Sequence, residues 1–124
     1  MDYRQITIRA EVIIEEGKIE EYEKLILQMS GVVAANEPNT MNYKFFLNRD
    51  ATKCIVWETY ANSDSVFAHM NGVASQKILP KISSVSKISR IEVYGNPSKE
   101  LQKTLIGFGA QIYNFFTGFS RYLP

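Results

Sequence analysis

The spacing of apolar residues changes several times along this chain of 124 residues, and no other feature constrains its fold as strongly. In residues 3–14 every second residue is apolar and several are β-branched, which predicts a half-buried strand. In residues 18–36 the apolar residues stand three and four positions apart, which predicts an amphipathic helix. Pro38 should end this helix, because helical geometry is disfavoured at the residue before a proline.

The remaining periodicities predict, in chain order, strands at 41–47 and 52–60, a helix opened by the polar residues 62–65, a strand at 85–94 and a helix from 97 onward. The turn at 48–51 is short and polar, so the two strands beside it should form a β-hairpin. Ile88 is out of phase with Ile91 and Val93, which indicates a bulge or a late start of that strand.

The last helix carries the most regular apolar spacing, in steps of four and three, with Pro97 in its first turn. Its apolar positions are Leu101, Leu105, Phe108, Ile112, Phe115 and Phe119. Gly107 and Gly109 each weaken a helix by about 1 kcal/mol relative to alanine, so each marks a bend or a close contact.

The predicted order β-α-β-β-α-β-α is that of an α+β protein, the ferredoxin-like βαββαβ arrangement with an added C-terminal helix. We expect residues 1–96 to form this domain. Residues 97–124 should form an amphipathic aromatic helix that belongs to the same domain or to an oligomer interface. The apolar face of this helix is wider than one small domain needs, so the helix should pack across a subunit boundary or cover a pocket. Its aromatic residues are Phe108, Tyr113, Phe115, Phe116, Phe119 and Tyr122.

Composition excludes several classes of function. Fourteen basic residues against 13 acidic ones give a net charge of +1, which argues against a nucleic-acid partner. One cysteine, Cys54, and one histidine leave too few ligands for a zinc site, so no metal is expected. Residues 104–120 lack charge but carry a polar stripe of Gln111, Asn114 and Thr117, which argues against a membrane span. The N-terminus has no apolar leader segment, so a cytoplasmic protein is expected.

Three segments, at 37–46, 57–70 and 93–98, resemble antibiotic biosynthesis monooxygenase domains. The first is a Glu-Pro turn leading into Tyr43 and further aromatics. The second is a strand with Glu58 and Tyr60, a capped turn and a helix that carries His69. The resemblance implies a dimeric α+β barrel and, for some members, oxygenation of quinols or polycyclic aromatics by O2 without metal, flavin or other cofactor. The related haem-degrading branch has an Asn in its first strand, which residues 3–14 lack.

Two residues are candidates for catalysis. His69 is the only histidine and the natural group for proton transfer at neutral pH, although it could instead fix its helix to a strand. Glu58 shares a strand face with Cys54, Val56 and Tyr60. A carboxylate on such a face needs a partner, and His69 is a reasonable one; an exposed or barrel-lining carboxylate is the alternative.

Five residues are candidates for binding a small aromatic or quinol-like ligand: Tyr43, Phe45, Trp57, Tyr60 and Met70. The same residues could simply be core. The expected function is therefore a cofactor-independent monooxygenase acting on a quinol or polyphenol, as a homodimer or a higher homo-oligomer. A non-catalytic binding or structural barrel, or an isomerase or decarboxylase on the same scaffold, remains an alternative.

Overall fold

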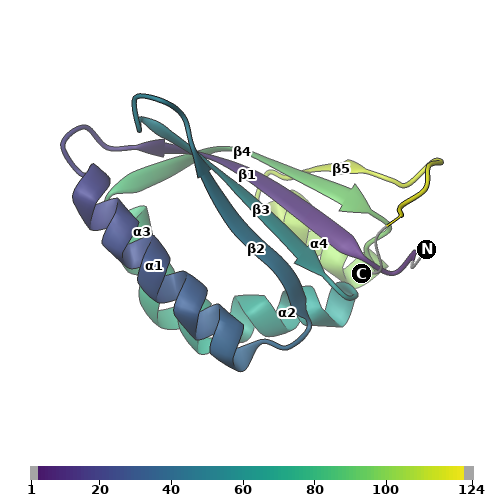
Figure 1. Ribbon diagram of the computed structural model, residues 1–124. Coiled ribbons are helices and arrows are strands. Elements are labelled where there is room, and N and C mark those ends of the chain that lie inside the picture. The colour runs from purple at the N-terminus through teal and green to yellow at the C-terminus, as the bar shows by residue number, and fades with distance from the viewer. Residues whose placement is uncertain (1–2, 122–124) are drawn as a thin grey trace.

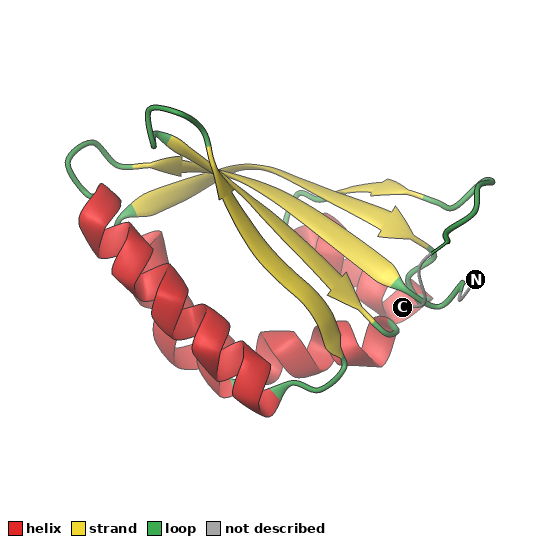
Figure 2. Ribbon diagram, viewed as in Figure 1, coloured by secondary structure: helices red, strands yellow, loops and turns green. Residues whose placement is uncertain are grey.

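The computed structural model describes residues 3–121 and is built on one sheet with all its helices on one face (Figures 1 and 2). Its elements are, in chain order, β1 (Ile6–Ile14), α1 (Ile19–Asn36), β2 (Thr40–Leu47), β3 (Lys53–Tyr60), α2 (Ser63–Asn71), the π-helical turn η1 (Ala74–Ile78), α3 (Leu79–Ser83), β4 (Ser86–Gly95), α4 (Lys99–Gly107) and β5 (Gln111–Tyr113). The strand order is β2-β3-β1-β4-β5. The first four strands pair antiparallel, which confirms the ferredoxin-like prediction.

The strands follow their predicted alternation. The even-numbered residues of β1 are buried toward the helices, and the odd-numbered residues lie on the open face. The pairing of β1 with β4 shifts by one residue at Glu11 and Val12, so Ser89 has no partner in the register. The Ser89 hydroxyl donates to the Glu11 carbonyl at 3.1 Å. This is the bulge that the phase of Ile88 predicted.

Side chains supply the turns and caps that the sequence indicated. The Asn48 carboxamide oxygen accepts hydrogen bonds from the backbone N–H groups of Thr52 and Lys53, both at 2.9 Å, and closes the hairpin. Asn62 caps α2 by accepting from the Ser65 N–H at 2.9 Å. Ser98 caps α4, so Pro97 precedes the cap and does not lie in the first turn, where it was predicted.

The predicted C-terminal helix is wrong beyond Gly107. There the helix ends, Gly109 takes a left-handed backbone (φ +83°), and the Ala110 N–H donates to the Leu105 carbonyl at 3.0 Å. The chain then adds β5 parallel to the exposed edge of β4. Two glycines in three residues oppose a helix, while the β4 edge offers unpaired backbone groups. Tyr122 lies outside the described residues.

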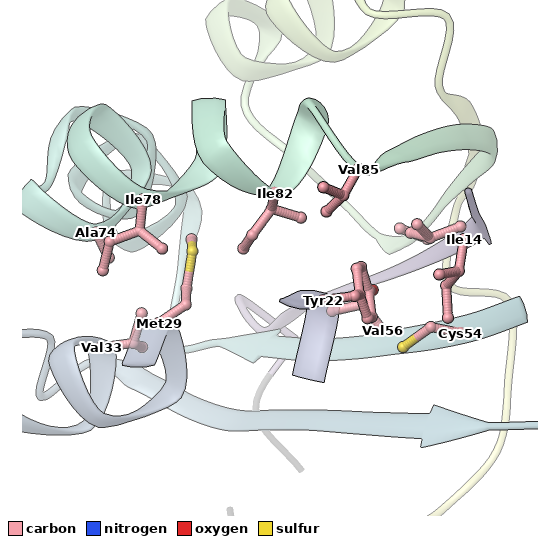
Figure 3. Packing of buried hydrophobic residues seen from close by; sticks show 12 residues of the cluster. Ile14, Tyr22, Met29, Val33, Cys54, Val56, Ala74, Ile78, Ile82 and Val85 are labelled. Atoms are coloured by element: carbon pink, nitrogen blue, oxygen red, sulfur yellow. The ribbon is translucent and has the colours of Figure 1, made fainter. Parts of the chain in front are cut away.

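Two buried clusters fill the space between the sheet and the helices. In the first, residues from α1, β3, η1 and α3 interlock, among them Tyr22, Met29 and Ile78 (Figure 3). In the second, Leu101 and Leu105 of α4 pack on Ile6 and Ile8 of β1, with Tyr60 and Val93. Helix α4 therefore packs on the same sheet as the other helices. No helix in residues 3–121 is long and apolar enough to cross a membrane.

Candidate functional site

A cavity of about 570 Å³, which we call the inner cavity, lies where the two buried clusters meet on the helix side of the sheet. Ala10 and Met29 of the first cluster and Ile8 and Leu105 of the second all line it. Its volume lies within the usual range for small-molecule sites. Four of its polar lining residues lie close together: Tyr43, Glu58, Tyr60 and His69. Ser75, Gln76, Ser89 and Arg90 also line the cavity, whose surface is nonetheless mainly apolar.

Strand β3 and helix α2 bring these groups together. The alternation of β3 places Glu58 and Tyr60 on the helix side, and α2 carries His69 in its last turn. Beyond that turn the Ser75 hydroxyl donates to the His69 carbonyl at 2.6 Å, and the Gln76 side chain donates to the Met70 carbonyl at 2.9 Å. These two bonds satisfy carbonyls that the end of a helix leaves open, and they hold the histidine over the sheet.

The closest partner of His69 is Glu37, at the end of α1. Pro38 keeps Glu37 out of helical geometry, and its backbone is accordingly near-extended (φ −125°, ψ 78°). Its Oε1 lies 2.7 Å from His69 Nδ1 and accepts a second bond from the Thr40 hydroxyl at 2.9 Å. Because a carboxylate only accepts, it selects the tautomer with the proton on Nδ1, which leaves Nε2 free as an acceptor in the neutral ring.

The Nε2 atom of His69 faces Glu58. Its distance from Glu58 Oε1 is 3.9 Å, which is an ion-pair distance and too long for a direct hydrogen bond. A hydroxyl oxygen placed between them could lie about 2.8 Å from both atoms. The Tyr60 hydroxyl donates to the same Oε1. The site therefore offers one position where a reacting oxygen would contact a histidine nitrogen and a carboxyl group together.

Burial raises the pKa of Glu58 above the usual carboxyl range, and the nearby Glu37 carboxylate acts in the same direction. The attraction of His69 and the hydrogen bond from Tyr60 oppose this shift without cancelling it. Glu58 therefore holds its proton to a higher pH than an exposed glutamate does. Such a shift in a cavity is typical of groups that carry protons in catalysis.

Two tyrosines complete the polar wall. The rings of Tyr43 and Tyr60 both lie 5.5 Å from the His69 ring, centre to centre. Burial, reinforced by the charge of Glu58, raises the pKa of both phenols far above the usual value. Both hydroxyls therefore stay protonated. That of Tyr60 donates to Glu58 Oε1, and that of Tyr43 can donate a hydrogen bond to a ligand oxygen.

The structure brings together five of the seven predicted site residues: Tyr43, Glu58, Tyr60, His69 and Met70. Phe45 packs edge-on against Tyr43, with ring centres 4.8 Å apart, and is a partly buried residue that packs against the first buried cluster. Trp57 lies on the open face of the sheet, where it stacks on Tyr94 at 6.5 Å. The prediction that Trp57 shares a pocket with Tyr43 fails because neighbouring residues of a strand point to opposite faces, and Glu58 already points inward.

The residue that sequence reasoning missed is Glu37. It stands in the Glu-Pro turn that carried part of the family resemblance, and the signal available was a carboxylate directly before the proline that ends a helix. Phe108 was predicted on a helix and instead caps α4, at the rim of the inner cavity. Within residues 3–121, no group of three or more His, Cys, Asp or Glu side chains is placed to hold a metal ion.

The raised pKa of Glu58 makes stability depend on pH. The folded protein keeps this proton at pH values where the unfolded chain, with a carboxyl pKa of 4.5, has lost it. The contribution of this proton to the free energy of unfolding is complete below pH 4.5 and is lost as the pH rises through the pKa of folded Glu58. The loss is about 1.4 kcal/mol for each unit by which the folded pKa exceeds the unfolded one. Glu58→Gln removes the free-energy cost of ionising a buried carboxyl group, because a carboxamide does not ionise. We therefore expect the variant to be more stable than the wild type at pH 8, with the gain vanishing toward pH 4.5.

Urea denaturation at several pH values measures this difference, and Glu11→Gln is the matched control. The Lys53 ammonium lowers the pKa of Glu11, so that variant should lose stability at pH 8 and converge with the wild type in acid. A loss of stability in Glu58→Gln at pH 8, with the same sign as in the control, would contradict the proposed burial cost.

Comparison with solved structures identifies the fold of this protein. No family model and no curated protein sequence matches the chain. Among solved structures, MupZ from Pseudomonas fluorescens superposes with a TM-score of 0.82 at 23% identity, over 95% of both chains. A "putative antibiotic biosynthesis monooxygenase" from Caulobacter crescentus gives 0.67 at 20% identity, over 78% of this chain and 93% of its own. SnoaB from Streptomyces nogalater, a cofactor-independent oxygenase, superposes with a TM-score of 0.66 at 10% sequence identity. The match covers 77% of this chain and 96% of SnoaB. The chain therefore has the fold of the antibiotic biosynthesis monooxygenases, as the resemblance of its sequence predicted.

Proposed function

We propose that this protein is a small-molecule enzyme in which His69 and Glu58 transfer protons in the inner cavity, and that its reaction is the cofactor-independent oxygenation of a quinol or polyphenolic compound. The observation that carries the proposal is the facing pair of His69 Nε2 and Glu58 Oε1, 3.9 Å apart at the wall of a mainly apolar cavity. Structural neighbours that include a cofactor-independent oxygenase support the choice of reaction.

In this reaction His69 would act as the base. A phenolic hydroxyl between His69 and Glu58 would give its proton to Nε2, and the Glu37 carboxylate at 2.7 Å would stabilise the imidazolium that forms. The Glu58 carboxyl, with its raised pKa, would then donate a hydrogen bond to the substrate anion, while the Tyr60 hydroxyl keeps donating to Glu58 Oε1 and holds that carboxyl in place. The apolar walls would keep water from this anion while it reacts.

The electrons for O2 would come from the substrate itself. The substrate anion passes one electron to O2, and the two radicals join to form a carbon–oxygen bond. The peroxide that results takes up a proton and loses water, which leaves a carbonyl at the oxidised carbon. In sum, the phenolic O–H and the C–H of the oxidised carbon supply the two hydrogens of one H2O, and O2 supplies the oxygen of this water and that of the new carbonyl, so no outside reductant is required.

A second candidate is a proton-transfer reaction that consumes no O2, such as an isomerisation. One observation favours it: the cavity wall holds an acceptor, His69 Nε2, and a carboxyl of raised pKa, Glu58, with His69 Nε2 and Glu58 Oε1 3.9 Å apart. An acid and a base at this separation can remove a proton from one atom and return it to another.

Oxygen uptake on a panel of hydroquinones and anthrones tests the proposal. At least one compound should consume O2 in proportion to enzyme, and His69→Ala should lower the rate by about 10²–10⁴-fold because the general base is lost. Glu58→Gln should lower the rate as well, since a carboxamide N–H is a weaker hydrogen-bond donor to the substrate anion than a carboxyl O–H. Leu27→Ala, at a site 74% exposed on α1, is the control and should keep the wild-type rate.

Three outcomes decide between the candidates. Uptake that depends on His69 supports the oxygenase. Conversion of a compound without O2 uptake, again dependent on His69, supports the isomerase instead. Binding without conversion would contradict the catalytic role and indicate a binding module. A fully active His69→Ala variant would show that His69 is not the base.

We also propose that the working unit is a homodimer joined through the open face of the sheet. That face carries large apolar side chains with much exposed surface, among them Phe46 at 54%, Tyr113 at 44% and Trp57 at 38%. No helix of the described chain covers it (Figure 2). Aromatic residues on a sheet face of this kind are typical of an interface with a second copy.

Light scattering should therefore give a mass near twice 14.2 kDa, or a higher multiple. Phe46→Glu places a charge on the proposed interface and should shift the mass to that of one chain. Lys81→Glu on α3, across the sheet from that face, is the charge control and should leave the mass unchanged. A wild-type monomer at micromolar concentration would refute the dimer.

A further inference from the structure

A second cavity, also about 570 Å³, lies on the other side of Glu37, and we call it the outer cavity. It is formed between the turn after α1 and helix α2, and Gly72 and Glu37 both line it. Most of its other lining residues are polar and none is aromatic: the side chains of Asn36, Asn39, Thr40, Asn62, Asp64 and Ser65 contribute. Its lining is thus more polar than that of the inner cavity, and its polar groups can bind water.

The Glu37 carboxylate separates the two cavities. Its side chain is only 9% exposed, and its two oxygens have different neighbours. Oε1 lies 2.7 Å from His69 Nδ1, and the His69 ring lines the inner cavity. Oε2 lies beside Gly72, where an added Cβ would come within 3.2 Å of it. One carboxylate therefore contacts the acid–base site with one oxygen and the wall of the outer cavity with the other.

We infer that Glu37 and His69 form a proton path that connects Glu58 and the inner cavity to water in the outer cavity. The inference rests on the proposed acid–base function and extends it to Glu37. Its physical reason is that a bound substrate fills the inner cavity, so a proton released there needs an exit on another side. A proton that leaves through His69 and Glu37 reaches the outer cavity without crossing the inner cavity, so this route remains available while the substrate is bound.

Each transfer along the path balances. A proton from the substrate or from Glu58 binds Nε2, and the ring, now doubly protonated, releases its Nδ1 proton to Glu37 Oε1. Glu37 then gives a proton to water in the outer cavity and is a carboxylate again. The ring is left with its proton on Nε2, and the reverse transfer, when a proton returns to the product, restores the Nδ1–H tautomer. No net charge accumulates over a full cycle.

This role differs from simple positioning of the ring. A positioning partner needs only to accept the Nδ1–H hydrogen bond, which a glutamine carbonyl oxygen can also do. A proton path requires a group that can itself take up and release the proton, which an amide at this position cannot do. Glu37→Gln therefore separates the two roles, because it keeps the hydrogen bond and removes the carrier.

The chain offers a direct readout, because His69 is its only histidine. Labelling with ¹⁵N-histidine gives one pair of ring nitrogens, whose shifts report the tautomer and whose Nδ1 proton exchanges with water at a measurable rate. We expect Glu37→Gln to keep the Nδ1–H tautomer and to slow the exchange of that proton at least tenfold. Glu37→Ala should lose the tautomer preference.

A second pair of variants leaves the carboxylate intact. Gly72→Ala puts a methyl group beside Oε2 on the outer side and should also slow the exchange, whereas Gly31→Ala on α1, where an added Cβ meets open space, should not change it. Two results would contradict the proton path. One is a Glu37→Gln variant that keeps the tautomer but slows the exchange of the Nδ1 proton by less than tenfold. The other is equal exchange rates in the two glycine variants. The exchange measurement uses no substrate. A negative oxygen-uptake panel would therefore contradict the proposed reaction, whereas the exchange rates alone decide whether the proton path exists.

Discussion

The hydrogen bond between His69 and Glu37 is the interaction on which the site depends. It joins the end of α1 to the last turn of α2, across 32 positions of sequence, and both side chains are close to fully buried. A buried carboxylate without a partner is costly, so each of the two groups stabilises the position of the other. The bond also fixes which nitrogen of the ring faces the inner cavity. Without it, Glu58 would face a ring of undefined orientation.

The sheet supplies the rest of the geometry. Because β3 alternates, Glu58 and Tyr60 point to the helices, while Trp57 on the same strand points to the open face. The helices divide the space above the sheet into two clusters, and the inner cavity is the gap between them. Phe108, at the end of α4, extends the cavity wall at its rim. A mainly apolar space with its proton carriers gathered on one wall suits chemistry that water would disturb.

Most of the fold followed from local patterns in the sequence. The alternation of β1, the spacing of α1 and the cap at Asn62 are short-range features, and each predicted its element. The end of α4 did not follow, because Ile112 satisfies a helical spacing and also fits a strand that pairs with β4. Only the exposed edge of β4, a tertiary feature, decides between the two. For the same reason Glu37 escaped notice, since its partner lies far along the chain.

The proposed site binds a phenolic or quinol oxygen between His69 and Glu58. A crystal structure of the protein with 2-naphthol bound tests this position without requiring turnover. We expect the naphthol oxygen within about 3 Å of both His69 Nε2 and Glu58 Oε1, with the rings against the apolar walls of the inner cavity. Naphthol bound on the open face of the sheet, or in the inner cavity with its oxygen turned away from His69, would contradict it.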